Sequence, residues 1–236
     1  MDTDPSEEQL IIMQVHKLHR IDPVRKQAES GVDGTHGLSP MDPPDAYAPP
    51  NIAPVPVGAL HPFLREFSEE HVLFLEELNA FEAAILSVQE SGYTRESDAR
   101  LRHFFHYLDQ EFTPHSRREE VALFPLLRER LIGSGEHGSG SVPATATELM
   151  EDEHAKAMQL AAVVVSFLGL VFRLPDERSG MIVLDAALEQ GKNLVELLRL
   201  HVFREDNVIF ALAHRLISSA EFDEMQSRAA AAGRSR

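Results

Sequence analysis

The chain has 236 residues, a net charge of −16, and neither cysteine nor tryptophan. The lack of cysteine excludes disulfides, thiolate zinc sites and cysteine-ligated iron–sulfur clusters. The acidic balance argues against a nucleic-acid partner, because such binding depends on lysine and arginine neutralising phosphates, and it favours the attraction of cations.

Residues 1–60 are predicted to form an N-terminal extension. They hold most of the fourteen prolines, and from about residue 40 to Pro56 these should keep the backbone extended. A short helix or strand over Glu7–Arg20 would carry His16 and His19 three residues apart. Those two histidines are a candidate for a small second metal site, and a surface extension is the alternative.

Nothing in the sequence resembles a targeting or membrane segment. The first residues are acidic, and the apolar run Leu10–Met13 is too short for a signal peptide. The most apolar stretch, Leu160–Phe172, is shorter than the roughly 18 residues that a membrane span needs, so we expect it in a buried helix. We therefore expect a soluble, cytoplasmic protein without a membrane partner.

From residue 61 the sequence is typical of long helices, with apolar residues recurring every three or four positions. The pattern predicts helices over residues 62–90, 95–132, 144–172 and 177–218. Short connections between them predict an all-α, up-down-up-down four-helix bundle over 61–220, followed by a C-terminal tail at 221–236. Pro114 and Pro125 fall inside the second helix and should kink it.

One motif occurs twice, as HSRREEVALFPL from His115 and as HVFREDNVIFAL from His201. Each histidine is followed four residues later by a glutamate, Glu119 or Glu205. Residues so spaced share one face of a helix, where an imidazole and a carboxylate can bind the same metal ion.

The repetition extends beyond these pairs. Arg118 matches Arg204, and Glu120 matches Asp206. The first and third helices each carry a Glu-His pair, Glu70-His71 and Glu153-His154. The bundle is therefore predicted to have internal pseudo-twofold symmetry.

Each predicted helix thus contributes one histidine to the interior, and two helices add a glutamate. The candidate metal ligands are His71, His115, Glu119, His154, His201 and Glu205. Such a nitrogen and oxygen set suits iron, manganese or zinc, in a two-metal site with the ions about 3.5–4 Å apart. The alternative is a set of hydrogen-bonded core histidines and surface ion pairs.

Bridging glutamates would give each ion about four protein ligands, where octahedral iron takes about six. An oxo or hydroxo bridge would add one ligand to each ion and still leave an exchangeable position. Glu151 is a further candidate ligand, with a solvated helix face as its alternative. The other eight histidines are predicted to lie at the surface or behind the ligands.

The arrangement resembles the hemerythrin-like, or HHE cation-binding, family over residues 61–220. The resemblance implies a four-helix bundle with a non-haem di-iron centre that meets O₂, NO or peroxide. Oxygen-carrying hemerythrins have a second histidine where this chain has Met158, and an H-x-x-x-x-D motif where it has His201 and Glu205. The set is more similar to bacterial proteins linked to iron-centre repair and to the iron-sensing domain of a ubiquitin-ligase subunit.

Ferritin-like proteins are the nearest rival fold, but they need Glu-x-x-His on two helices. In this chain only Glu151 and His154 fit that pattern.

Three functions remain open. The first is a di-iron protein that binds or senses O₂, NO, peroxide or iron itself, with such a small molecule as its partner. The second is a di-iron enzyme: an oxidase, peroxidase, NO reductase or iron-centre repair protein. The third is a metal-stabilised interaction module whose proline-rich segment binds a protein partner. Six phenylalanines are candidates for a substrate channel, with core packing as the alternative: Phe104, Phe105, Phe112, Phe124, Phe203 and Phe210.

Overall fold

The computed structural model describes residues 52–138 and 143–233. The chain divides into two units, Met1–Ala48 and Pro49–Arg236, and the second is described here. The predicted element at Glu7–Arg20, its two histidines and most of the proline-rich segment lie outside the described residues.

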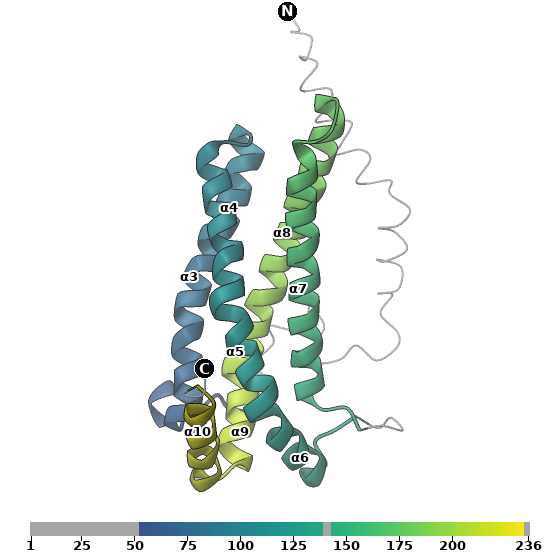
Figure 1. Cartoon of the computed structure of the whole chain (residues 1–236). Helices are drawn as coiled ribbons and strands as arrows, with labels where there is room; N and C mark the ends of the chain where they lie inside the picture. Colours follow the sequence, from purple (N-terminus) through teal and green to yellow (C-terminus); the bar gives the residue numbers. More distant parts are fainter. Residues whose placement is uncertain (1–51, 139–142, 234–236) are drawn as a thin grey trace, which may run out of the picture. The chain divides into compact units, whose positions relative to one another are not determined.

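The described residues form helices and contain no strand (Figure 1). The four predicted helices are confirmed almost to the residue, although the second and fourth are divided by short π-helical segments. The α-helices are α3 Pro62–Ser91, α4 Arg95–Tyr107, α5 Thr113–Arg118, α6 Phe124–Ser134, α7 Ala146–Val171, α8 Glu177–Arg204, α9 Phe210–Leu216 and α10 Ser219–Gly233. The π segments are η2 Leu108–Phe112, η3 Glu119–Leu123 and η4 Glu205–Ile209, and a 3₁₀ turn, η1 Val57–Ala59, precedes α3.

Local signals explain where the helices begin and end. Pro62 opens α3, and the side chain of His61 caps it by accepting from the backbone N–H of Phe63. Gly92 ends the helix at a φ of 80°, which only glycine adopts without strain. Thr94 then starts α4 with a reciprocal capping box.

The two prolines of the second helix each follow a π-helical segment. Pro114 is the second residue after η2, and Pro125 is the second residue after η3. Proline lacks an N–H donor and its ring collides with the carbonyl four residues earlier. A locally wider helix accommodates this defect, and each predicted kink position therefore has a π segment just before it, while the kinks themselves stay a prediction.

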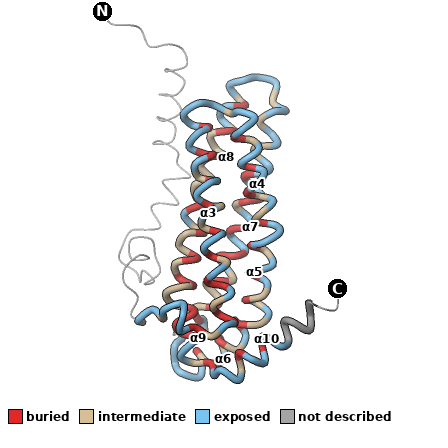
Figure 2. The backbone as a smooth tube through the Cα atoms, turned by 90° about the vertical axis from the view of Figure 1, so that its left-hand side faces the viewer, coloured by how far each residue is buried: buried red, intermediate tan, exposed pale blue. Residues whose placement is uncertain are grey.

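The core lies between the helices, whose inner sides carry the buried residues (red in Figure 2). Helix α3 packs against α4 and α8, and α7 packs along α8. Phe81 of α3 stacks on Phe104 of α4 with ring centroids 4.0 Å apart. A Cβ on Gly191 of α8 would lie 2.7 Å from Cδ1 of Ile85, so this glycine permits the close approach of α8 to α3.

Two expectations need correction. Residues 221–236 were expected to be a tail, but α10 occupies Ser219–Gly233 and packs on α3 and η3, with Phe222 and Met225 buried. The stretch Leu160–Phe172 was expected to be buried, but only one side of this part of α7 faces the core. Its other side is exposed, because a helix at the outside of a bundle can bury only one face.

Candidate metal centre

The six predicted ligands lie together inside the bundle. His71 comes from α3, His115 from α5, His154 from α7 and His201 from α8. Glu119 and Glu205 are the first residues of η3 and η4. All six are buried, and π segments of this kind often occur at functional sites.

The ligands form two groups that share both glutamates. His71 and His115 make one group with Glu119 and Glu205, and His154 and His201 make the other with the same two carboxylates. Within each group the ligand atoms all lie within 4.8 Å of one another. This is the arrangement expected of two neighbouring ions with carboxylates between them.

The imidazoles face one another in pairs. Nε2 of His71 lies 3.2 Å from Nε2 of His115, and Nε2 of His154 lies 3.1 Å from Nε2 of His201. The carboxylates sit against these atoms: Oε2 of Glu205 is 3.1 Å from Nε2 of His71.

Every ligand histidine also has a carboxylate behind it, at Nδ1. His115 meets Glu70 at 2.7 Å, and His201 meets Glu153 at 3.1 Å. His154 meets Glu120 at 2.8 Å, and His71 meets Asp206 at 3.0 Å. An ionised carboxylate only accepts hydrogen bonds, so each Nδ1 carries a proton, and in the neutral form of the imidazole Nε2 then presents a lone pair to the centre.

These supporting contacts follow the pseudo-twofold pattern of the sequence. The glutamate that precedes the histidine of α3 or α7 supports the histidine of the next long helix. An arginine binds each of these two glutamates in turn: Arg118 donates to Glu70, and Arg204 donates to Glu153. The two halves differ in exposure, because the side chains of Glu70 and Arg118 are 38% and 37% exposed whereas those of Glu153 and Arg204 are 7% and 6% exposed.

The carboxylates of the two central glutamates, Glu119 and Glu205, lack hydrogen-bond donors within the described part of the chain. All four of their carboxylate oxygens are buried, and none has a hydrogen-bond partner among the described residues. Burying such groups without partners is costly. Burial and the nearby charge of Glu205 raise the pKa of Glu119, whereas the adjacent His201 and His71 lower the pKa of Glu205 in spite of its burial. Cations between the carboxylates would satisfy all four oxygens.

The pKa values of the four histidines are also shifted, and not all in the same direction. Burial lowers the pKa of His115 and of His201, and burial together with the nearby His201 lowers the pKa of His154 to about 4. These three imidazoles are therefore neutral at pH 7, as metal ligands must be. Burial acts in the same direction on His71, but the carboxylates of Asp206 and Glu205, 3.0 and 3.1 Å from its two ring nitrogens, outweigh it and raise its pKa to about 9.

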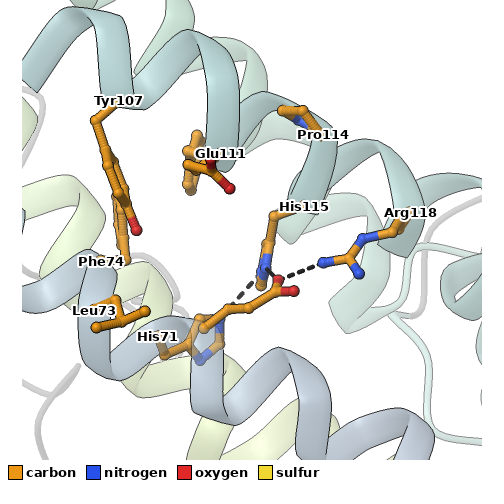
Figure 3. Close-up of a pocket in the computed structure, with 10 residues that line it drawn as sticks. His71, Leu73, Phe74, Tyr107, Glu111, Pro114, His115 and Arg118 are labelled. Atoms are coloured by element: carbon orange, nitrogen blue, oxygen red, sulfur yellow. Dashed lines mark hydrogen bonds and ion pairs between the residues drawn. The ribbon is translucent and has the colours of Figure 1, made fainter.

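A cavity of about 340 Å³ reaches the half of the centre formed by His71 and His115 (Figure 3). Leu73 and Phe74 of α3 line one part of it, and Tyr107 and Glu111 line another. Glu111 belongs to η2, and Pro114 also lines the cavity. The wider helical segment before Pro114 thus lies at the wall of this cavity.

The remaining sequence candidates lie elsewhere. Glu151 pairs with Arg128 at 2.7 Å and belongs to neither ligand group, and Met158 is exposed. The other described histidines, at 61, 103, 106, 137 and 214, also belong to neither group. Of the six phenylalanines proposed for a channel, only Phe112 lines this cavity, and three others are fully buried in the core, namely Phe104, Phe124 and Phe210.

Sequence reasoning assigned no role to the carboxylates behind the histidines, although all four belong to the repeated motifs. Their repetition was the available signal: Glu70 and Glu153 precede histidines, and Glu120 and Asp206 follow the ligand glutamates. Tyr107 and Glu111 were also missed, and the sequence offers no comparable signal for them.

Comparison with known families agrees with this geometry. No curated protein matches the chain. The model of the hemerythrin HHE cation-binding domain matches residues 63–213, a range that contains all six ligand candidates and the four carboxylates behind them. The chain therefore belongs to the hemerythrin family of HHE cation-binding domains.

Proposed function

We propose that the domain holds two iron ions at the four-histidine, two-glutamate centre and uses them to bind or sense O₂, NO, peroxide or iron. The observation that carries this proposal is the set of four buried carboxylate oxygens without hydrogen-bond partners. They lie between imidazole pairs whose Nε2 lone pairs converge. Two cations are the simplest occupants that satisfy every one of these atoms.

The ligand count supports an open site. Four imidazole nitrogens and four carboxylate oxygens provide about four ligands for each ion, whereas octahedral iron takes about six. Manganese and zinc accept the same donor atoms, and zinc is commonly complete with four ligands. Iron accounts best for the combination of buried carboxylates and free positions, and when bound it would supply reversible redox chemistry and small-molecule coordination.

The protein's own residues have separate tasks in this proposal. Glu70, Glu120, Glu153 and Asp206 hold the imidazoles in the tautomer that points Nε2 inward. Phe112 and Phe210 pack on the ligand histidines, which limits water around them. The cavity beside His71 and His115 gives a small molecule a route to the centre.

The architecture proposed for this chemistry is one up-down-up-down four-helix bundle with an N-terminal extension. In it α3 and α4–α6 form one hairpin, and α7 and α8–α9 form its pseudo-twofold counterpart. Each hairpin would then supply two histidines and one glutamate to the two ions.

The cavity also favours a second candidate, a di-iron enzyme such as an oxidase, peroxidase, NO reductase or iron-centre repair protein. At about 340 Å³ it falls in the size range of small-molecule pockets, which begins near 300 Å³. Tyr107, Glu111 and Arg118 add polar groups to its lining that a diatomic ligand alone would not need.

One experiment tests the function and separates the two candidates. The iron-loaded protein is reduced under anaerobic conditions and then mixed with NO, O₂ or peroxide while its optical spectrum is followed. A spectral change that reverses on removal of the gas supports binding or sensing, and continuous consumption supports the enzyme. Both should disappear in His115→Ala. No spectral response to any of the three would contradict both candidates.

A further inference from the structure

The outer face of α7 carries a second apolar seam, away from the metal centre. Its residues are spaced alternately by three and four, the spacing with which helices pair. Small residues alternate with larger ones along it, and all six are exposed. The seam consists of Ala155, Met158, Ala162, Val165, Gly169 and Phe172.

This face is unusual for so acidic a protein. No charged residue occurs from Met158 to Phe172, although the chain carries a net charge of −16. Met158 is 39% exposed, Val165 50% and Phe172 64%. Met181 and Ile182, near the start of α8, are also exposed. Contiguous exposed apolar surface of this kind marks an interaction site more often than isolated apolar residues do.

Gly169 supplies an independent observation. It lies inside α7, where glycine costs about 1 kcal/mol relative to alanine. A Cβ built on Gly169 would meet nothing within 4 Å, so packing among the described residues does not require glycine there. Close approach by another chain would explain it.

The order of small and large residues is complementary to itself when reversed. If two α7 helices lie antiparallel about a twofold axis between Val163 and Val164, every layer of the seam joins one small residue to one larger residue. The layers are Ala155 with the partner's Phe172, Met158 with the partner's Gly169, and Ala162 with the partner's Val165. Parallel alignment would place Gly169 opposite Gly169 and leave gaps.

Polar residues beside the seam fit the same alignment. Asp152 would lie near the partner's Arg173, and Gln159 near the partner's Ser166. Neither Asp152 nor Arg173 has an ion-pair partner among the residues that the structure describes. A twofold dimer would form the Asp152–Arg173 pair twice, once at each end.

We propose that a second copy of the chain binds this face, with the two α7 helices antiparallel about a twofold axis. Twofold dimers bury the same surface on both subunits, and the alternating seam has that self-complementary form. His154 and Glu153 face the core rather than the seam. The seam residues each lie one position after the core-facing ones, about 100° around the helix at 3.6 residues per turn.

A lipid bilayer is the competing occupant. By length and composition alone, α7 is apolar enough to cross a membrane. Its core side, however, contributes His154 to the metal centre and packs along α8. Asp152 and Arg173, at the two ends of the seam, can each form an ion pair with a second copy of the chain, whereas lipid tails offer them no charged partner.

The first test is sedimentation of the full, metal-loaded chain over a range of concentrations. The wild type should form dimers, and Val165→Glu should raise the dimer dissociation constant at least about tenfold, because the new carboxylate would be buried. Leu86→Glu, at an exposed apolar residue of α3, is the matched control and should dimerise normally. A wild type that stays monomeric, or an unaffected Val165→Glu, would overturn the proposal.

Charge reversal tests the alignment. Asp152→Arg and Arg173→Asp should each weaken the dimer, and the double variant should restore it, because the attraction is then rebuilt with opposite sign. Failure of the double variant to recover would rule out this antiparallel contact.

Cysteine cross-linking gives a second readout, since the natural chain has no cysteine. A mixture of Ala155→Cys and Phe172→Cys chains should form the mixed disulfide dimer. Ala155→Cys alone should not cross-link, because its two copies would lie about 25 Å apart at 1.5 Å per residue. Cross-linking of Ala155→Cys alone, or monomers that bind phosphatidylcholine vesicles through the same face, would contradict the dimer.

Discussion

Oε2 of Glu153 lies 3.1 Å from Nδ1 of His201, and both side chains are buried. In the equivalent contact of the other half, His115 is also buried, but the side chain of its partner Glu70 is 38% exposed. The same local design therefore works in two environments. A buried carboxylate depends on its partners far more than a solvated one, so the two glutamates should respond differently to the same substitution.

Glu153→Gln should weaken metal binding about 10- to 100-fold, since it removes the carboxylate that orients His201. It should also destabilise the fold by about 3–5 kcal/mol, because it removes the negative charge that the buried Arg204 guanidinium binds. Chelator competition measures the first effect and urea unfolding the second. Glu70→Gln is the matched control: its Arg118 is partly solvated, so the loss of stability should be much smaller. Equal losses of stability in the two variants would contradict the view that the buried Glu153 depends more on its partners than the partly exposed Glu70 does.

Metal removal should lower the thermal stability of the wild type, because bound ions stabilise only the folded state. Glu119→Gln should bind metal so weakly that a chelator scarcely changes its Tm. Differential scanning calorimetry with and without chelator measures both. Glu151→Gln, outside the ligand groups, should behave as the wild type does. A Glu119→Gln protein with a full metal-dependent shift would show that this carboxylate is no ligand.

Access to the centre is tested at Leu73, an exposed residue that lines the cavity. Leu73→Trp should fill part of the opening and slow NO binding to the iron-loaded protein by about tenfold or more. Lys156 occupies the corresponding position after the Glu-His pair of α7, so Lys156→Trp is the control and should leave the rate unchanged. Stopped-flow spectroscopy gives the rates. Equal rates for the two variants would mean that NO uses another route.

The C-terminal helix contributes to the fold through Phe222. Its ring is 2% exposed and stacks on His61, with the centroids 5.0 Å apart. Phe222→Ala should lower the free energy of unfolding by about 3–5 kcal/mol. Gln226→Ala, on the exposed side of α10, should change it by no more than about 0.5 kcal/mol. If both variants are as stable as the wild type, α10 does not dock as described.

The helices and the grouping of the six candidate ligands were predictable because their signals are local. Apolar spacing marked α3, α7 and α8, and the repeated histidine and glutamate pairs marked the ligands four residues apart. The carboxylates behind the histidines were visible as repeats, but their role depends on contacts between different helices. Glu120, for example, supports His154 from another helix, and no spacing along one helix reveals that.

Other features could not be predicted from the sequence, for different physical reasons. The cavity depends on η2, a change in helical hydrogen bonding that Pro114 signals only indirectly. Among the side chains that are described in α10, Phe222 and Met225 are buried within a polar and alanine-rich stretch, and this pattern is too weak to separate from a tail. The exposed face of α7 was misjudged because apolar content alone does not say which side of a helix meets the core.

The most direct test of the metal centre is the iron content of the purified chain, measured by elemental analysis after loading with ferrous iron and removal of unbound metal. The proposed centre predicts two iron ions per chain in the wild type and a loss of this stoichiometric binding in the Glu119→Gln, Glu205→Gln double variant. A wild type without stoichiometric metal, or a double variant that still holds two ions, would contradict it.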